Sequence, residues 1–306
     1  MENVKLSPAQ KFWKTVKSNP IVVLLVVVGI IVGFTKDNFF SWRNFGNLAS
    51  NTAVRFLIAL GVSGCLITKG TDLSAGRQVG FAACLAGVLL QRANYAGRLF
   101  PNMPEMNMGV VLLIVLAIGA VFGLLNGLII AFLNVPPFIA TLGTQTIIYG
   151  ISLVFTDAQP IGGFQESYNN LINGCIGDPK GFYLPYLLFV AVLFGLFFWF
   201  LYNKTCHGKY MYAMAGYLLA AKSGGASASM GNGYELEAIA GCTIGGVSTT
   251  GGIGTIGGVL VGVLVFEFLK IVLQFLGVNP YYNYMVQGIV IVTAVALDIR
   301  KYIAKK

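Results

Sequence analysis

Apolar residues along this chain gather in long runs that are separated by short polar segments. A helix that crosses the hydrocarbon core of a bilayer needs about 20 mostly apolar residues. About nine stretches approach that length, at about 20–35, 54–69, 74–92, 109–133, 137–156, 183–203, 236–252, 254–277 and 281–299. The pattern predicts an all-α polytopic membrane protein, with residues 1–306 forming a single transmembrane domain.

The clearest boundary between two predicted spans lies at Asn134–Pro137. No Asp, Glu, Lys or Arg occurs from Gly109 to Thr156, and that stretch is too long for one helix. Because proline has no backbone N–H and its ring hinders a continuing helix, Pro136 and Pro137 predict a tight loop between two spans.

The composition supports a lipid-embedded chain. Hydrophobic residues make up 56% of the sequence and charged residues only 10%, whereas about a quarter of an average soluble domain is charged. This excludes an ordinary soluble enzyme, a disordered regulator and a disulfide scaffold. The five cysteines are scattered without CxxC spacing, and there is one histidine, so we expect no metal site, no cofactor and no nucleic-acid partner.

Basic residues predict the orientation, because cytoplasmic loops carry an excess of Lys and Arg. The N-terminus, residues 203–209 and residues 300–306 are basic and are predicted to lie in the cytoplasm. Alternation from a cytoplasmic N-terminus gives outside for 93–108 and 157–182, and inside for 134–136 and 204–235. Nine spans would then leave the C-terminus outside, in conflict with its charge.

Two accounts of this conflict remain open. The first is a re-entrant element at 235–258, where glycine is frequent. Each glycine costs a helix about 1 kcal/mol relative to alanine, and membranes tolerate irregular backbone that is buried in protein or lines a cavity. The second account is a span that is absent from this chain, and it is the preferred one.

Charged side chains inside apolar spans are unfavourable, so they mark candidate functional positions. Asp72 and Ser74 lie between the second and third predicted spans, where they either cap the next helix or take part in gating or subunit contact. Glu267 and Lys270 are three residues apart and can pair on a helix, and contact with substrate is the other interpretation.

The sequence lacks the motifs of ATP hydrolysis and of common catalytic sites. It has no GxxxxGK[ST] loop, and no Ser/His/Asp, HExxH or paired-carboxylate arrangement. We therefore predict a protein that is not an enzyme. An ion-coupled secondary transporter, which would depend on Glu267 and Lys270, is the main alternative class, and an intramembrane enzyme is the third.

Several stretches resemble one family of transport proteins. Ile67–Gly76 reads ITKGTDLSAG, Val135–Thr144 reads VPPFIATLGT, and Tyr234–Ala240 reads YELEAIA. These segments resemble the permeases of ABC sugar importers of the ribose and galactose type. Gly70–Gly80 and Val278–Tyr281 are most similar to the galactose type.

The resemblance implies a permease subunit that works as a homodimer in the bacterial inner membrane. It also implies a periplasmic sugar-binding protein that delivers substrate and a cytoplasmic ABC ATPase that drives transport. Polar residues among apolar walls are the candidates for the translocation path: Asn126, Thr141, Thr144 and Gln145. The candidates for a gating or structural motif are Asp72, Ser74, Gly245, Gly246, Gly251 and Gly252.

By the same resemblance, residues 204–224 are expected to form the cytoplasmic segment that couples to the ATPase. Its matching residues are Ala220, Ala221, Ser223 and Gly224, whereas Leu218 and Leu219 replace a proline and a glutamate. The link that follows, 225–233, is short, and relatives have one more membrane helix between Lys222 and Tyr234. A coupling-defective shortened permease is therefore a further alternative.

Overall fold

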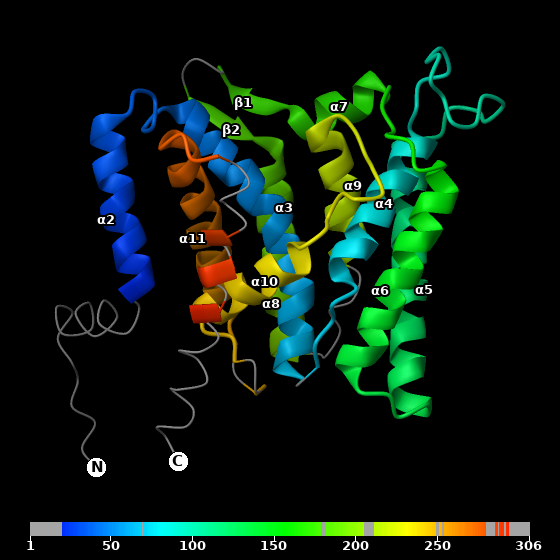
Figure 1. Ribbon diagram of the computed structural model, residues 1–306. Coiled ribbons are helices and arrows are strands. Elements are labelled where there is room, and N and C mark those ends of the chain that lie inside the picture. Colours follow the sequence, from blue (N-terminus) through cyan, green and yellow to red (C-terminus); the bar gives the residue numbers. More distant parts are fainter. Residues whose placement is uncertain are drawn as a thin grey trace.

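The computed structural model describes residues 20–68, 70–178, 182–204, 211–248, 251–252, 254–279, 285–286, 288–290 and 292–293. The elements, in chain order, are α2 (Pro20–Thr35), α3 (Trp42–Ile67), α4 (Ala75–Leu89), α5 (Met108–Phe132), α6 (Pro137–Thr156), α7 (Glu166–Asn173), β1 (Cys175–Gly177), β2 (Tyr183–Pro185), α8 (Tyr186–Lys204), α9 (Met211–Ser223), α10 (Tyr234–Ile244) and α11 (Ile256–Phe275) (Figure 1).

The long helices run side by side as a bundle, and α3 lies at its centre, in contact with α8, α9, α10 and α11 (Figure 1). Strands β1 and β2 pair antiparallel, with Ile176 opposite Leu184, and together with α7 they cover one end of the bundle. We call this end the hairpin end. The N-terminal turn of α3 and the last turn of α11 lie at the same end (Figure 1).

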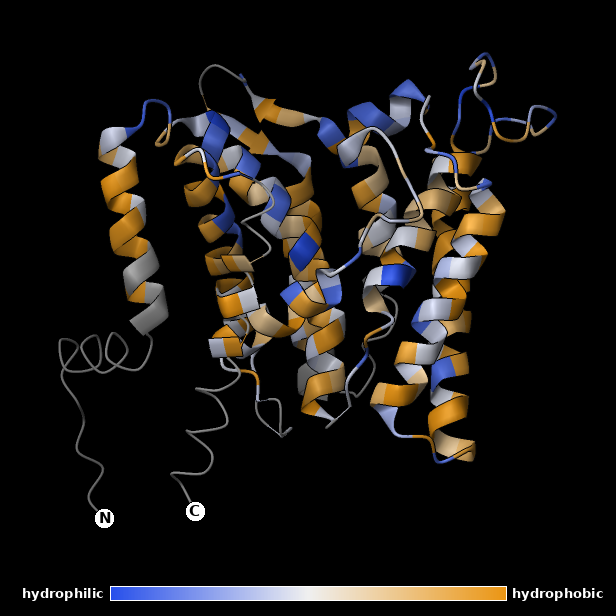
Figure 2. Cartoon of the chain, viewed as in Figure 1, coloured by the Kyte–Doolittle hydropathy of each residue, from blue (hydrophilic) through white to orange (hydrophobic). Residues whose placement is uncertain are grey.

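The outer helices present apolar side chains to their surroundings. Leu113 on α5 is 67% exposed and Val154 on α6 is 85% exposed. In Figure 2, hydrophobic residues dominate α2, α5, α6 and α8, and polar residues gather at the hairpin end. Water would strongly disfavour so much exposed apolar surface, whereas lipid accepts it. The chain is therefore a multi-pass membrane protein.

Most of the predicted spans correspond to helices of this bundle. Four of the described helices, α3, α5, α6 and α11, are long and apolar enough to cross a bilayer, while α2, α4 and α8 contain shorter apolar stretches. The nine predicted spans are therefore not established. Residues 183–185 form strand β2 and not the start of a span, and most of the stretch 281–299 lies outside the described residues.

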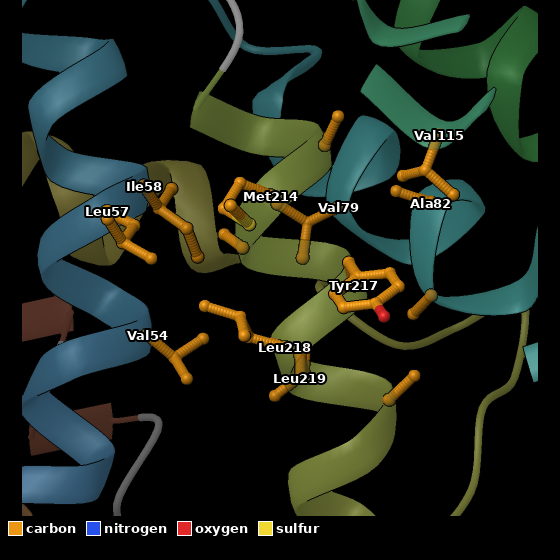
Figure 3. Packing of buried hydrophobic residues seen from close by; sticks show 14 of the residues in the cluster. Val54, Leu57, Ile58, Val79, Ala82, Val115, Met214, Tyr217, Leu218 and Leu219 are labelled. Atoms are coloured by element: carbon orange, nitrogen blue, oxygen red, sulfur yellow. The ribbon is translucent and has the colours of Figure 1, made fainter. Parts of the chain in front are cut away.

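Most of the predicted coupling segment, 204–224, forms helix α9, and its coupling role stays a prediction. Figure 3 shows its residues Met214, Leu218 and Leu219 packed between α3 and α4, in the buried core. At the hairpin end, Asn173 Nδ2 of α7 donates to the carbonyl oxygen of Ala221 at 2.9 Å. The backbones of Ile161 and Ala226 also pair there. Residues 157–173 and 221–226 therefore share one end, so the assignment of all of 204–235 to the side opposite 157–182 is wrong.

The chain returns from α9 beside α4 without helical structure. Helical glycines on α4 allow this close approach, because a Cβ at Gly80 would lie 2.2 Å from the carbonyl oxygen of Met230, and one at Gly76 would lie 2.4 Å from that of Gly231. Arg77 holds the same segment through Nη1, which donates to the carbonyl oxygen of Ala228 at 3.4 Å. Part of this irregular backbone, at Ala226, Ala228 and Gly231, is thus buried inside the protein, as a membrane requires.

The prediction that a helix is missing between Lys222 and Tyr234 stays a prediction, and residues 224–233 between these two positions form a connection without helical structure. Residues 225–233 form a hydrogen-bonded connection in which Ala226, Ala228 and Gly231 are buried and Ser229 and Asn232 are exposed. Helix α10 continues from it toward the end of the bundle opposite the hairpin (Figure 1). Helix α9, with 13 residues, runs beside α3 and α4 before this connection, and it is not among the described helices that are long and apolar enough to cross a bilayer. The sequence predicts a coupling segment here because Ala220, Ala221, Ser223 and Gly224 match the family pattern.

We predict that Gly80→Ala destabilises the bundle, because its Cβ meets fixed backbone of Met230. Overpacking of this kind costs about 1–3 kcal/mol, so the unfolding temperature in detergent should fall by several degrees. The control is Gly150→Ala on α6, where nothing lies within 4 Å of the added Cβ and helix propensity improves. Equal unfolding temperatures of the two variants would contradict the proposed close packing.

A second prediction concerns the sides of the membrane. In a cysteine-free background, Ser223→Cys and Gln159→Cys should react with an impermeant thiol reagent from the same side, because both lie at the hairpin end. Leu133→Cys, in the loop between α5 and α6, should react from the other side. Labelling of Ser223→Cys together with Leu133→Cys would show that the last turn of α9 does not lie at the hairpin end.

Candidate functional site

Four charged side chains meet in the middle of the bundle. Arg55 Nε, about halfway along α3, lies 2.8 Å from a carboxylate oxygen of Glu237 on α10 and 2.8 Å from one of Glu267 on α11. Lys270 Nζ lies 2.7 Å from Glu237 and 3.0 Å from Glu267. We call these four residues the ion network. Two cations and two carboxylates balance each other.

The predicted pairing of Glu267 with Lys270 is confirmed, since the two are one helical turn apart and hydrogen bonded. The sequence analysis missed Arg55 and Glu237, which lie 182 residues apart in the chain. A signal existed: Arg55 is a cation in the apolar middle of α3, whereas Arg43 lies in its first turn. A charged residue at such a position usually has a partner or a function. Nothing in the sequence indicated which partner.

Because the four side chains of the ion network are largely buried, each positive charge needs a negative partner. Glu267 is only 1% exposed, and the side chains of the other three members are 13–18% exposed. Removing one partner from such a cluster leaves a buried charge uncompensated, which is strongly destabilising. The Arg55 guanidinium also lies 4.6 Å from the centre of the Tyr234 ring, a favourable cation–π contact.

A cavity of about 480 Å³ opens at the hairpin end, above the ion network. Its walls come from α3, α11, the ends of α7 and α9, strand β2 and the start of α8. Amide side chains dominate the polar part of the lining: Asn38, Asn44, Asn47, Asn51, Asn173 and Gln274. We call this cavity the polar chamber.

Lys222 of α9 connects the polar chamber to the ion network. Its Nζ donates to Asn51 Oδ1, and both residues line the chamber. Asn51 precedes Arg55 by one turn of α3, and Ile271, also in the lining, follows Glu267 by one turn of α11. The network therefore lies directly beneath the floor of the chamber.

Asp72 forms a tight turn with Ser74, the N-cap residue of α4, which makes no side-chain cap hydrogen bond, so capping by Asp72 stays a prediction. Asp72 Oδ1 accepts hydrogen bonds from the backbone N–H of Ser74 at 2.9 Å and from the Ser74 hydroxyl at 2.6 Å. Ser74 Oγ in turn accepts from Asn126 Nδ2 of α5 at 2.9 Å. These bonds join the start of α4 to α5, and a role in gating stays a prediction.

The four predicted path residues lie on α5 and α6, apart from the polar chamber. Asn126 and Thr141 are buried, and Thr141 Oγ1 accepts from the backbone N–H of Leu73. Thr144 and Gln145 are half-buried on the next turn of α6, where Thr144 Oγ1 donates to the carbonyl oxygen of Thr141. The structure brings the first two together with Ser74, and their place in a path stays a prediction.

The predicted glycine motif forms the connection between α10 and α11. Gly245 ends α10, where a Cβ would lie 2.0 Å from the carbonyl oxygen of Gly258. Gly246, Gly251 and Gly252 have φ of 84°, 88° and 82°, which side chains disfavour. The backbone N–H of Gly252 donates to the carbonyl oxygen of Ile67 at 3.0 Å, so the connection is attached to the end of α3.

The predicted coupling residues lie at the C-terminal end of α9, and their coupling role stays a prediction. Ala220 and Ala221 are fully buried among α3, α4 and α7. Ser223 and Gly224 are exposed, but they lie at the hairpin end with residues 157–173. Small residues of α9 allow it to approach α4 closely, because a Cβ at Gly216 would lie 2.4 Å from the carbonyl oxygen of Val79.

The helical bundle and its apolar exterior define a polytopic α-helical membrane protein. A family model described as "Branched-chain amino acid transport system / permease component" matches residues 44–215 and 211–295, and the chain belongs to this permease family. No solved structure matches it.

Several relatives match this chain over nearly its whole length. The galactose/methyl galactoside import permease protein of Escherichia coli (strain K12) is 43% identical, over 93% of this chain and 94% of its own length. The same-named protein of Haemophilus influenzae is 42% identical, over 97% and 98%. The ribose import permease protein of E. coli K12 is 31% identical, over 95% and 96%.

These alignments contain a gap on the side of this chain. The alignment to the E. coli galactose relative has 319 positions but includes only 93% of the 306 residues here, so roughly thirty positions of the relative have no counterpart. The family match is divided into two parts that meet at residues 211–215. These residues are the first turn of α9.

The ion network predicts a large penalty for Arg55→Met, because Glu237 and Glu267 would keep only Lys270. We expect a loss of about 3–5 kcal/mol of unfolding free energy. Arg92→Met, which removes an exposed pair with Glu166, should cost less than about 1 kcal/mol. Glu237→Gln added to Arg55→Met restores the balance of charge and should recover part of the loss. Thermal unfolding in detergent measures all three, and similar values for Arg55→Met and Arg92→Met would contradict the network's role.

Proposed function

We propose that this chain is the transmembrane permease subunit of an ATP-driven importer that carries galactose or methyl galactosides across the bacterial inner membrane. The observation that carries the proposal is the identity of 43% to the galactose/methyl galactoside import permease protein over nearly the whole of both chains. Similarity of this extent includes both the membrane-spanning helices and the connections that position them.

In this proposal the energy comes from a partner. The sequence contains no nucleotide-binding P-loop, so a cytoplasmic ABC ATPase hydrolyses ATP, and a second copy of the permease completes the translocation path. The hairpin end faces the periplasm, where a sugar-binding protein delivers substrate, and both termini lie in the cytoplasm. Two features support this orientation: the basic termini and the polar chamber that opens at the hairpin end.

Transport then consists of a shift between outward-open and inward-open arrangements of the bundle, each favoured by a different ligand. The Asp72 turn and the Gly245–Gly252 connection are the elements proposed to move, since both join helix ends through short irregular backbone. Asn126, Thr141, Thr144 and Gln145 are proposed to contribute to the path along α5 and α6.

A second candidate function is a sugar permease that does not couple to an ATPase. The gap of roughly thirty positions, with the family match divided at 211–215, favours it. Helix α9 has 13 residues, or about 20 Å at 1.5 Å per residue, whereas the hydrocarbon core is about 30 Å thick. We infer that the missing residues precede α9 and include the segment that docks to the ATPase. Galactoside would then cross only down its gradient.

One experiment separates these functions. The chain is expressed in cells that lack their own galactose permease but keep the ATPase and the binding protein, and uptake of labelled methyl galactoside is measured. A matched variant carries the residues of the E. coli relative inserted before Met211. Uptake by the original chain that stops on ATP depletion supports the importer.

The other outcomes identify the alternatives. Downhill flux in the original chain, with ATP-dependent uptake only in the variant with the insertion, supports the uncoupled permease. Uptake that survives ATP depletion but collapses with the proton gradient indicates an ion-coupled transporter. If neither chain moves the galactoside while both reach the membrane, the proposed sugar function is wrong.

A further inference from the structure

We propose that the polar chamber is a binding station for a single neutral sugar ring, which the sugar occupies before it passes the ion network. The inference rests on the proposed function and names the place where that substrate binds. The cavity of about 480 Å³ is within the range of about 300–1,000 Å³ that is typical of small-molecule sites.

The lining provides the hydrogen-bonding groups that a sugar needs. Each hydroxyl of a sugar both donates and accepts, and an amide side chain offers an NH₂ donor and a carbonyl acceptor close together. Within the described part of the chain, Asn47 and Gln274 make no side-chain hydrogen bond, and both are exposed to the cavity. Asn44 and Asn173 use their NH₂ groups on Phe39 and Ala221, which leaves their carbonyl oxygens available.

The charges around the chamber favour a neutral ligand. No Asp or Glu belongs to the lining formed by the described residues, so a cation has no carboxylate to bind. Of the two cationic residues there, Lys222 is engaged by Asn51 at the floor, and Arg43 lies exposed in the first turn of α3. An anion would therefore find no free buried counter-charge.

Tyr183 adds an apolar surface to the chamber. Its ring rests directly on α3 at Gly46, where a Cβ would lie 1.8 Å from a ring carbon, so only glycine permits this position. A ring held in this way can pack against the C–H face of a sugar while the amides bind its hydroxyls. The lining thus combines one aromatic face with several neutral donors and acceptors.

The residues at the inner end of the chamber explain why the sugar would stop there. Lys222 and Asn51 close the chamber, and the ion network lies one turn below them on α3 and α11. A neutral ring cannot replace any member of a balanced set of four buried charges. Passage further inward therefore requires α3, α10 and α11 to separate at the network.

Protection of introduced cysteines tests the binding station without requiring transport. In a cysteine-free full-length chain reconstituted in nanodiscs, Asn47→Cys and Gln274→Cys are labelled with a small thiol reagent, with and without methyl β-galactoside. We expect saturating galactoside to slow labelling at both positions by roughly fivefold or more, and leucine to have no effect. The matched controls are Asn102→Cys and Gln159→Cys, which are exposed at the same end but outside the chamber.

Side-chain removal provides the second measurement. Asn47→Leu and Gln274→Leu should each weaken galactoside binding by roughly three- to tenfold, the effect of a lost hydrogen bond, while Asn102→Leu and Gln159→Leu leave it unchanged. Calorimetry measures the binding of galactoside to each variant. An unchanged unfolding temperature shows that the variant is still folded.

The results that overturn the inference are distinct from failure of the proposed function. Galactoside flux through the membrane, with no protection at Asn47→Cys or Gln274→Cys, would show that the sugar binds elsewhere. Protection by leucine and not by galactoside would show an amino-acid site. Failure of the thiol reagent to reach either position would show that the chamber is closed to solutes.

Discussion

Four charges buried in one low-dielectric region are the constraint on which this bundle depends. Arg55, Glu237, Glu267 and Lys270 come from three helices, and none of them can leave the cluster without exposing an unpaired charge to an apolar interior. The network therefore fixes α3, α10 and α11 relative to one another more specifically than apolar contacts do. The polar chamber lies between the network and the hairpin end, and the glycine-rich connection between α10 and α11 lies toward the opposite end.

A second constraint acts on the backbone. Residues 225–233 are not helical, yet Ala226, Ala228 and Gly231 are buried against the bundle, where every buried N–H and C=O needs a partner or a protein neighbour. Glycines on α4 supply the room, and the short helix α10 continues the crossing from the middle of the bundle. The same segment positions Tyr234 and Glu237, so close packing at Gly76 and Gly80 supports the ion network indirectly.

The parts of the fold that depend on local sequence were predictable. The uncharged stretch with Pro136 and Pro137 predicts α5, its loop and α6 almost residue by residue, and one-turn spacing predicts the pairing of Glu267 with Lys270. Helix α9 was not predictable in the same way, because it is short and is held by packing against α3 and α4 that local sequence does not reveal. The alanines of α9 match the family's docking pattern, and in this structure they are buried in the bundle.

The chamber and the full ion network depend on contacts between distant segments. Asn47, Asn173, Lys222 and Gln274 come from four different helices, and no spacing along the chain connects them. Composition could indicate only that polar residues are rare and therefore informative. The family resemblance predicted the class of function, but it did not predict these residues.

The most direct test of the account is a structure of the full chain in a lipid nanodisc, determined by electron cryo-microscopy in the presence of methyl β-galactoside. The account predicts α9 between α3 and α4, the four-residue network intact, and sugar density in the chamber above it. Density for α9 outside the bundle, or sugar bound away from Asn47 and Gln274 above an empty chamber, would contradict it.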